Sequence, residues 1–248
     1  MCTVVVAAGL WPGVPLAVTA NRDESLARPS EGPRVREIGG TRVFAPLDLE
    51  AGGTWWGLAQ SGMFAILTNR FDGRGPEPGR RSRGLVVADA LAAGNVDAAA
   101  RRIAREDAAR HNPFHLILLE RDRAELVWND RRQLHRRRLE AGLHVVTERS
   151  LDAYPTERPE RVRRYLAPFV DGAFPGLRPL RGVLAERDPT RPMESVAVSL
   201  PERSYGTISS MQGVWETAGS PQLYFADGPP PDTPYAPLGP EVASFLTR

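Results

Sequence analysis

The sequence predicts an α+β fold built around mostly antiparallel β-sheets. Segments rich in β-branched and apolar residues come first, two helix-like segments follow, and further strands with one more helix complete the chain. This order differs from the regular strand–helix alternation that builds a parallel βαβ sheet. The first two strand-like segments are joined by a very short turn, which requires them to run antiparallel. We therefore expect an α+β sandwich.

The first two strands are expected at residues 3–9 (TVVVAAG) and 15–20 (PLAVTA), because both segments are β-branched and apolar. The connection at 10–13 (LWPG) has the Pro-Gly chemistry of a tight turn. If the turn centres near residue 12, position i faces position 24 − i, and Cys2 lies opposite Arg22. The hairpin is thus expected to bring the single cysteine of the chain to the polar sequence NRDE.

A second hairpin is expected from residues 54–60 (TWWGLAQ) and 63–69 (MFAILTN), which flank a Ser-Gly pair. Residues 72–80 (DGRGPEPGR) are rich in glycine and proline and are expected to form a loop. The later strand-like segments are 114–119, 124–129, 132–138, 143–147, 195–200, 205–210 and 222–226.

Three helices are expected. Residues 82–93 carry a broad apolar face, and residues 96–110 are rich in Ala and Arg behind the plausible N-cap Asn95. Residues 157–167 form the third, with Thr156 as its plausible N-cap. A proline-rich stretch then leads to a short last element.

Length and composition are those of a globular protein. The 248 residues suffice for one large domain or two small ones, and 42% are hydrophobic and 25% charged. We see no internal repeat and no domain-sized linker, and therefore expect a single domain over residues 1–248. No apolar run approaches the roughly 18–20 residues that span a bilayer. The first residues lack the features of a signal peptide, so we expect a cytoplasmic protein without membrane insertion.

Several kinds of site are not expected. One cysteine excludes an intramolecular disulfide and a multi-cysteine zinc site. The net charge is +2 and all basic residues are Arg; the run 136–138 is interpreted as a solvated face, and no nucleic-acid partner is expected. His111 and His115 have a spacing that would suit a metal or haem on a helix, but Pro113 lies between them. We expect one in a loop and the other in a strand, and predict no metal or cofactor.

The motifs of the first 90 residues resemble those of the NRDE family, whose animal members are called transport and Golgi organisation protein 2. The late stretch 205–207 (YGT) also resembles a family motif. The main matching stretches are 1–2 (MC), 21–24 (NRDE), 28–30 (RPS), 52–55 (GGTW), 67–69 (LTN) and 83–84 (RG).

The layout of the first 70 residues is also similar to that of the cysteine N-terminal-nucleophile (Ntn) hydrolases, such as penicillin V acylases and bile salt hydrolases. Those enzymes begin Met-Cys and carry Arg and Asp at the end of their second strand and Asn after a later one. The resemblance implies a four-layer αββα sandwich of two mostly antiparallel sheets. It also implies a function, acyl transfer on a small non-peptide amide or a related acyl compound.

The residue types present suit that chemistry. Removal of Met1 would expose a thiol and an α-amine on Cys2, and the amine, with a pKa of about 7.7–8.0, can act as general base for the thiol. Arg22 is the candidate cation that lowers the pKa of the thiol or binds a substrate carboxylate. Asp23 is expected to orient the amine, and Asn69 to donate to an oxyanion.

Three further residues are candidate substrate-binding positions. Asn21 offers a second amide donor or an orienting group, and Trp55 and Trp56 lie on opposite faces of one strand. One of the two tryptophans is expected in the core and the other at a pocket.

A structural interpretation stands beside each functional one. A lone cysteine on a strand is commonly a small buried hydrophobe, Arg22 and Asp23 together suit a structural ion pair, and Asn69 suits a turn. The sequence also departs from the family, because Ile208 stands where many members have Arg after Tyr-Gly-Thr. No second-half Asn or Arg of the hydrolases is matched securely.

The resemblance leaves a second function open. The animal relatives are implicated in lipid metabolism, Golgi organisation and haem handling, which implies a non-enzymatic protein that binds haem or an acyl chain on the same fold. Such a carrier needs an apolar pocket but no free α-amine. Under the hydrolase hypothesis the partner is a small-molecule substrate and no cofactor is needed.

Overall fold

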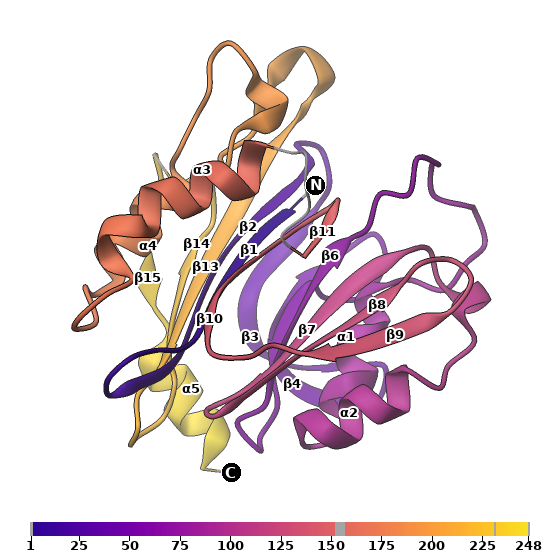
Figure 1. Cartoon of the computed structure of the whole chain (residues 1–248). Helices are drawn as coiled ribbons and strands as arrows, with labels where there is room; N and C mark the ends of the chain where they lie inside the picture. Colours follow the sequence, from indigo (N-terminus) through magenta and orange to yellow (C-terminus); the bar gives the residue numbers. More distant parts are fainter. Residues whose placement is uncertain (1, 152–156, 231, 248) are drawn as a thin grey trace. The chain divides into compact units, whose positions relative to one another are not determined.

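The chain folds into two compact units, each with one antiparallel sheet (Figure 1). The computed structural model describes residues 2–151, 157–230 and 232–247. The first unit combines Met1–Arg28 with Ala141–Gly239, and the second combines Pro29–Glu140 with Pro240–Arg248. The predicted α+β class with two mostly antiparallel sheets is confirmed. That the two units form a single domain stays a prediction.

The sheet of the first unit has the order β11-β10-β1-β2-β13-β14-β15, with β12 beside β13. The strand nearest the amino terminus therefore lies inside the sheet, between β10 and β2. The strands of this unit are β1 (Cys2–Trp11), β2 (Val14–Ser25), β10 (Gly142–Thr147), β11 (Ser150–Leu151), β12 (Ser199–Leu200), β13 (Tyr205–Trp215), β14 (Gln222–Ala226) and β15 (Ala236–Pro237).

Two α-helices, α3 (Glu157–Leu166) and α4 (Leu177–Leu184), lie along one face of this sheet (Figure 1). Alternate strand residues such as Val5 and Ala17 point to this face, as the two-residue period of a strand requires. They pack against helix residues such as Val162 and Val183 in one buried cluster. Short 3₁₀ helices flank these elements at Ala167–Phe169, Pro192–Glu194 and Pro201–Arg203.

The sheet of the second unit has the order β3-β4-β5-β6-β7-β8-β9, so neighbouring strands follow one another in the chain. Helices α1 (Gly84–Leu91) and α2 (Val96–Ile103) pack on one face of it. Its strands are β3 (Ser30–Ile38), β4 (Thr41–Asp48), β5 (Trp56–Leu58), β6 (Phe64–Asn69), β7 (Phe114–Glu120), β8 (Arg123–Asn129) and β9 (Leu134–Arg138). The last helix is α5 (Gly239–Leu246), whose Phe245 packs against Phe44 of β4.

Two backbone segments approach very closely in the second unit. A Cβ atom on Gly53 would lie 2.6 Å from the carbonyl carbon of Gly84, and a Cβ on Gly84 would lie 2.8 Å from the nitrogen of Thr54. The Thr54 N–H donates to the Gly84 carbonyl at 3.2 Å. Glycine at both positions therefore lets the start of α1 dock on the segment before β5.

Four strands and one helix have no counterpart in the sequence prediction. Strands β3, β4, β11 and β15 were not expected; β3 is an edge strand with Pro33 inside an irregular register between Glu31 and Arg34. Proline is tolerated at such a position because an edge strand leaves backbone groups outside the ladder. Helix α4 was also missed, since Pro179 stands within it; there it occupies the first turn, where a missing N–H costs little.

Several segments are shorter than expected, among them the predicted strand 54–60, which is reduced to β5. The predicted helix 96–110 ends at Ile103 and continues as the 3₁₀ turn Ala108–Arg110, whose Asp107 side chain accepts from the N–H of Ala109. The predicted strand 195–200 is reduced to β12. The expected N-cap Asn95 is confirmed, since its side chain accepts from the Ala98 N–H at 2.8 Å. Thr156 lies outside the described residues.

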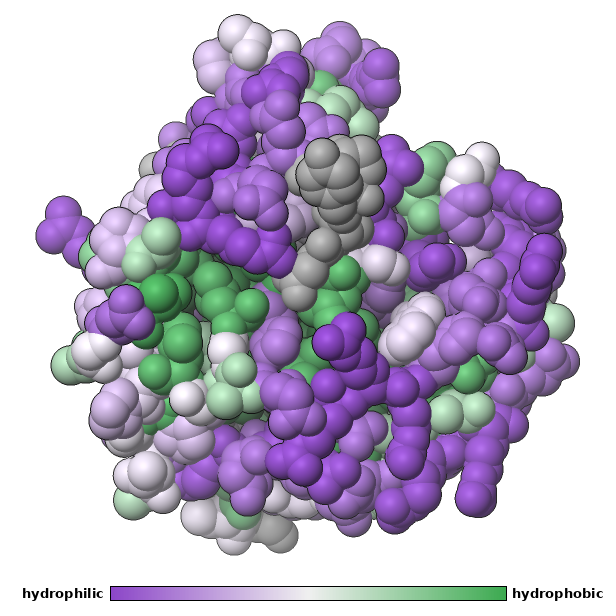
Figure 2. Space-filling model, in the orientation of Figure 1, coloured by the Kyte–Doolittle hydropathy of each residue, from purple (hydrophilic) through white to green (hydrophobic). Residues whose placement is uncertain are grey.

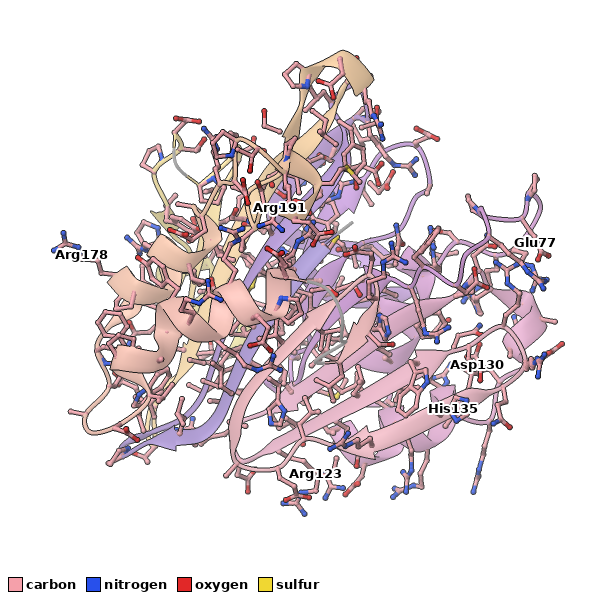
Figure 3. All side chains as sticks on the ribbon, turned by 45° about the horizontal axis from the view of Figure 1, so that its top comes forward. Glu77, Arg123, Asp130, His135, Arg178 and Arg191 are labelled. Atoms are coloured by element: carbon pink, nitrogen blue, oxygen red, sulfur yellow. The ribbon has the colours of Figure 1, made fainter. Side chains whose placement is uncertain are left out.

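The loop at 72–80 is confirmed and is fixed by charges (Figure 3). Arg131 binds Asp72 through its Nε at 2.6 Å and also pairs with Glu77. The backbone N–H of Glu77 donates to Asn112 at 2.8 Å. This glycine- and proline-rich segment is therefore held at several points by the β8–β9 turn and the segment before β7.

His115, a buried residue of β7, makes the protein sensitive to acid. Its Nδ1 lies 3.1 Å from the hydroxyl of Thr68, and burial lowers its pKa to about 3, with the charge of Arg70 acting in the same direction. The folded protein keeps this ring neutral, whereas the unfolded chain binds a proton below a pH of about 6.5. The stabilisation is therefore complete above that pH and is lost as the pH falls toward 3.

We expect His115 to make folding about 2 kcal/mol less favourable as the pH falls from about 6.5 to about 4.5. In His115→Gln this part of the acid dependence disappears, although the variant is less stable at neutral pH. Urea unfolding at several pH values measures the free energy of unfolding. His144→Gln, at a half-buried position of β10, is the control. An unchanged acid slope in His115→Gln would contradict the prediction.

Among the described residues, no helix has both the length and the apolar character needed to cross a membrane. On the face shown in Figure 2, hydrophilic residues predominate and hydrophobic ones gather in a smaller area. The large hydrophobic side chains that are exposed in the described part of the chain are Leu26, Val35, Leu49, Phe71 and Met193.

Candidate functional site

The hairpin of β1 and β2 places Cys2 directly opposite Arg22, as the sequence predicts. The tight turn lies at Pro12-Gly13, where Trp11 pairs with Val14. A bulge between Ala8 and Trp11 then shifts the register by one residue. The turn is centred half a residue later than the prediction assumed. The bulge compensates for this difference, and the predicted pairing of Cys2 with Arg22 is therefore right.

The polar sequence NRDE lies inside β2 and does not end it. The adjacent strand β13 pairs with this stretch: Thr207 faces Asp23, Ser209 faces Arg22, and Ser210 faces Asn21. Cross-strand partners share a face, and successive residues alternate. The Cys2 and Arg22 side chains therefore belong to one face of the sheet, and those of Asn21 and Asp23 to the face that carries α3 and α4.

Asp23 is fully buried and firmly oriented. Its Oδ1 accepts a hydrogen bond from the Thr207 hydroxyl at 2.6 Å, and its backbone carbonyl accepts one from the Tyr205 hydroxyl at 2.9 Å. Burial raises the pKa of its carboxyl group, and the charge of Arg158 is the largest influence that lowers it. Burial likewise raises the pKa of Tyr205. The family motif at 205–207 thus supports Asp23 directly.

Arg158, in the first turn of α3, is a buried cation that sequence reasoning missed. Its Nη1 lies 3.2 Å from Oε2 of Glu148 and 4.0 Å from Oδ2 of Asp23. Its Nη2 donates to the carbonyl oxygen of Met193 at 2.5 Å. The sequence indicates this cation in one way only: an arginine occupies a position of the predicted helix that faces the sheet.

Asn21 has a structural role in this unit. Its amide nitrogen donates to the carbonyl oxygens of Leu184 and Val196 at 2.9 and 2.8 Å, and its oxygen accepts from Ser210 at 2.7 Å. Both amide hydrogens are thus used within the fold. This geometry indicates that Asn21 connects β2 to the end of α4. It favours this structural role over the predicted contact of Asn21 with substrate.

The thiol of Cys2 is half-buried. We expected Arg22 to lower the pKa of this thiol, and this expectation needs correction. Burial raises the pKa of the thiol, and this effect exceeds the opposing effects of the Arg22 charge and of a hydrogen bond from the Asp23 backbone N–H. Arg22 acts in the predicted direction but does not make a resting thiolate. A reaction at this sulfur therefore needs a base that removes the proton as the bond forms.

The remaining predicted site residues belong to the second unit. Asn69 is the last residue of β6, half-buried and paired with Phe114. Trp56 is the predicted core tryptophan, since it is 0% exposed and packs between Phe44 and Phe64. Trp55 is half-buried and precedes β5, which begins at Trp56, so the expected placement of the two tryptophans on opposite faces of one strand is wrong. The catalytic role of Asn69 and the substrate-binding roles of the tryptophans stay predictions.

The two histidines lie in different local structures. His111 follows a 3₁₀ turn and its ring contacts the backbone oxygen of Arg81 and the carboxylate of Glu106. His115 is the strand residue described above, so the expected loop and strand placements are confirmed. Within the described ranges, no group of three or more His, Cys, Asp or Glu side chains is arranged to hold a metal ion.

Ile208 lies at the bulge of β13 between Thr207 and Ser209 and is half-buried. An apolar side chain thus stands at the position where the family resemblance implies Arg. The cation that comes near Asp23 in this chain is Arg158, from a helix.

Comparison with known proteins gives a family and a fold. The model of the family described as Transport and Golgi organisation 2 matches residues 1–212. No curated protein matches the sequence.

Two solved structures are similar to this chain over most of its length. An N-acylethanolamine-hydrolyzing acid amidase ortholog from Caenorhabditis elegans has a TM-score of 0.57 at 14% identity, covering 86% of this chain and 92% of that one. The C2A mutant of a conjugated bile acid hydrolase from Clostridium perfringens also has a TM-score of 0.57, at 12% identity, covering 97% and 93%. At these identities the likeness shows the fold, which is of the Ntn-hydrolase type.

Proposed function

The chain belongs to the Transport and Golgi organisation 2 family, and we propose that it acts as a cysteine Ntn hydrolase on a small non-peptide amide or related acyl compound. The observation that carries the proposal is the pairing of Cys2 with Arg22 on a strand inside the sheet. The thiol and the guanidinium thus lie on one face at this end of the hairpin, and the buried carboxylate of Asp23 lies on the other face at the same end.

The proposed reaction starts from a chain whose Met1 has been removed. The Cys2 amine takes the thiol proton while sulfur attacks the substrate carbonyl, so that a C–S bond forms as the carbonyl oxygen becomes negative. The oxyanion then collapses, the C–N bond breaks, and the leaving amine takes the proton. Water hydrolyses the thioester, with the α-amine acting again as base, and releases the acid.

Two further residues have roles in this proposal. Asp23, held by Thr207, accepts a hydrogen bond from the α-ammonium that forms during attack. Arg22, opposite the thiol, binds negative charge on the substrate or favours the sulfur anion as it develops. The donor role of Asn69 remains a prediction from the sequence.

The names of the similar structures agree with this class of chemistry. One is an amidase for N-acylethanolamines and the other a hydrolase for conjugated bile acids. The second structure is of a C2A mutant, so that protein also carries cysteine at position 2. These names support acyl-transfer chemistry here and leave the substrate open.

The first test is the intact mass of the purified protein, before and after incubation with a set of acyl p-nitroanilides and p-nitrophenyl esters. We expect loss of Met1 and a mass gain of one acyl group after acid quenching. In a chain that retains Met1, burial raises the pKa of the thiol, so alkylation by iodoacetamide is expected to be slow near pH 6. Retained Met1, or no adduct with any acyl group, would contradict the proposal and favour a ligand-binding function.

A further inference from the structure

A buried group of charges lies beside Asp23 on the face of the sheet that carries α3. Arg158 is 2% exposed and reaches two carboxylates, those of Glu148 at 3.2 Å and of Asp23 at 4.0 Å. One guanidinium thus faces two acids, so the three groups carry a net charge of −1 when all are ionised (+1 − 2). At this depth an unmatched second negative charge would be costly.

The position of Arg158 is fixed from both ends of its side chain. Its backbone belongs to the first turn of α3. This turn is held by Arg191 (labelled in Figure 3), which pairs with Glu157, and by Arg161 at 2.7 Å from Asp188. Its Nη2 donates to the carbonyl oxygen of Met193. The guanidinium is therefore a rigid charge and not a mobile surface one.

Glu148 directly follows β10, the strand that borders β1 on the side away from β2. The register between the two strands pairs Val4 with Val146, and Glu148 follows in the turn between β10 and β11. The segment of Glu148 thus lies on the β10 side of β1, and Arg22 lies on the β2 side. The charges of this group lie at the same end of the sheet as the proposed nucleophile.

We infer that Arg158 and Glu148 are positioning residues for the proposed reaction: they set the charge state of Asp23 and so the orientation of the Cys2 amino group. The inference rests on the proposed function. Arg158 favours the charged carboxylate that the ammonium needs, whereas Glu148 opposes it and limits how strongly Asp23 is ionised. Neither residue touches the reacting atoms, and both act through Asp23.

The sign of each effect follows from the charges. Without Arg158 the two carboxylates repel each other and Asp23 keeps its proton to higher pH; without Glu148 it loses its proton at lower pH. The other ionisable groups around Asp23 are Cys2 and its amino group on β1, Tyr205 on β13, and the adjacent Arg22 and Glu24 on β2. The test leaves all of these unchanged.

The experiment compares Arg158→Gln with Glu148→Gln and measures the rate of acyl-adduct formation at Cys2 against pH. We expect the acid limb of the pH profile to shift to higher pH, by about one unit or more, in Arg158→Gln. In Glu148→Gln it should shift to lower pH. Both variants break the same ion pair, so a purely structural pair would change both profiles in the same way. Opposite shifts therefore separate the electrostatic role from a structural one.

Two variants complete the design. Arg164→Gln removes an exposed arginine from the same helix and leaves the pairs that hold its first turn, so its profile should keep the wild-type midpoint. Arg158→Lys keeps the positive charge, and the midpoint of its pH profile should be that of the wild type. This variant keeps the inference testable if Arg158→Gln fails to fold.

A second readout does not depend on turnover. Titration of ¹³C-labelled aspartate carboxyls, with the Asp23 signal assigned by its absence in Asp23→Asn, should show the same opposite shifts. Equal or absent shifts in both readouts would overturn the inference. If the wild type forms no adduct at all, the proposed function fails, and the carboxyl titration still decides whether Arg158 and Glu148 control Asp23.

Discussion

Replacement of Cys2 by alanine is expected to abolish acyl-adduct formation and to lower turnover by roughly 10⁴- to 10⁶-fold, as removal of a nucleophile does in other acyl-transfer enzymes. The sulfur is the atom that forms the covalent bond in the proposed reaction, and the chain has no other cysteine to replace it. Intact mass after acid quenching measures the adduct, and p-nitroaniline release measures turnover.

The effect should be chemical and not structural. Cys2 is half-buried at the start of β1, so its truncation should leave the thermal midpoint within a few degrees of the wild type. Cys2→Ser keeps a weaker nucleophile and should retain a small residual rate. Turnover that survives in Cys2→Ala would place the reaction elsewhere, and ligand affinity that survives without any turnover would favour a carrier.

The largest effect on stability is expected for Gly53→Ala and Gly84→Ala. A methyl group at either position would lie within 2.6–2.8 Å of backbone atoms of the partner segment. Backbone cannot move aside as a flexible side chain can, so α1 would be pushed off the segment before β5. We expect a loss of about 2–3 kcal/mol in the free energy of unfolding for each variant.

Gly75→Ala is the matched control for these two variants. A Cβ at that position meets nothing within 4 Å, and the change should stay within about 0.5 kcal/mol of the wild type. Urea unfolding of the three variants under one set of conditions makes the comparison. If Gly53→Ala and Gly84→Ala unfold at the wild-type midpoint, the close approach does not hold α1 in place.

The part of the site that could be predicted is the part made by local contacts. A short turn limits which residues of β1 and β2 can face each other, so Cys2 could be placed near Arg22 from the sequence; the exact pairing also depends on the bulge between Ala8 and Trp11. The same locality explains why the N-cap Asn95 and the hairpin of β5 and β6 were recognised. Patterns within about ten residues carry this information.

The part that could not be predicted depends on distant segments. Arg158 approaches Asp23 across 135 positions of the chain (158 − 23), and no spacing in the sequence relates the two. The direction in which the pKa of Cys2 shifts depends on how deeply the thiol is buried. Only the packing of distant segments determines that depth. Strand β3 was missed because edge strands tolerate proline and charged residues.

The place of β1 inside its sheet has a consequence for biosynthesis. Its partner β10 begins at Gly142, so the ribosome must add more than a hundred residues after Cys2 before that side of β1 can pair. At about 5–20 residues per second this takes roughly 7–30 s. During that interval the first residues of the chain have only the β2 hairpin for support, and an aminopeptidase acting on the nascent chain would meet the amino terminus before the finished sheet encloses it.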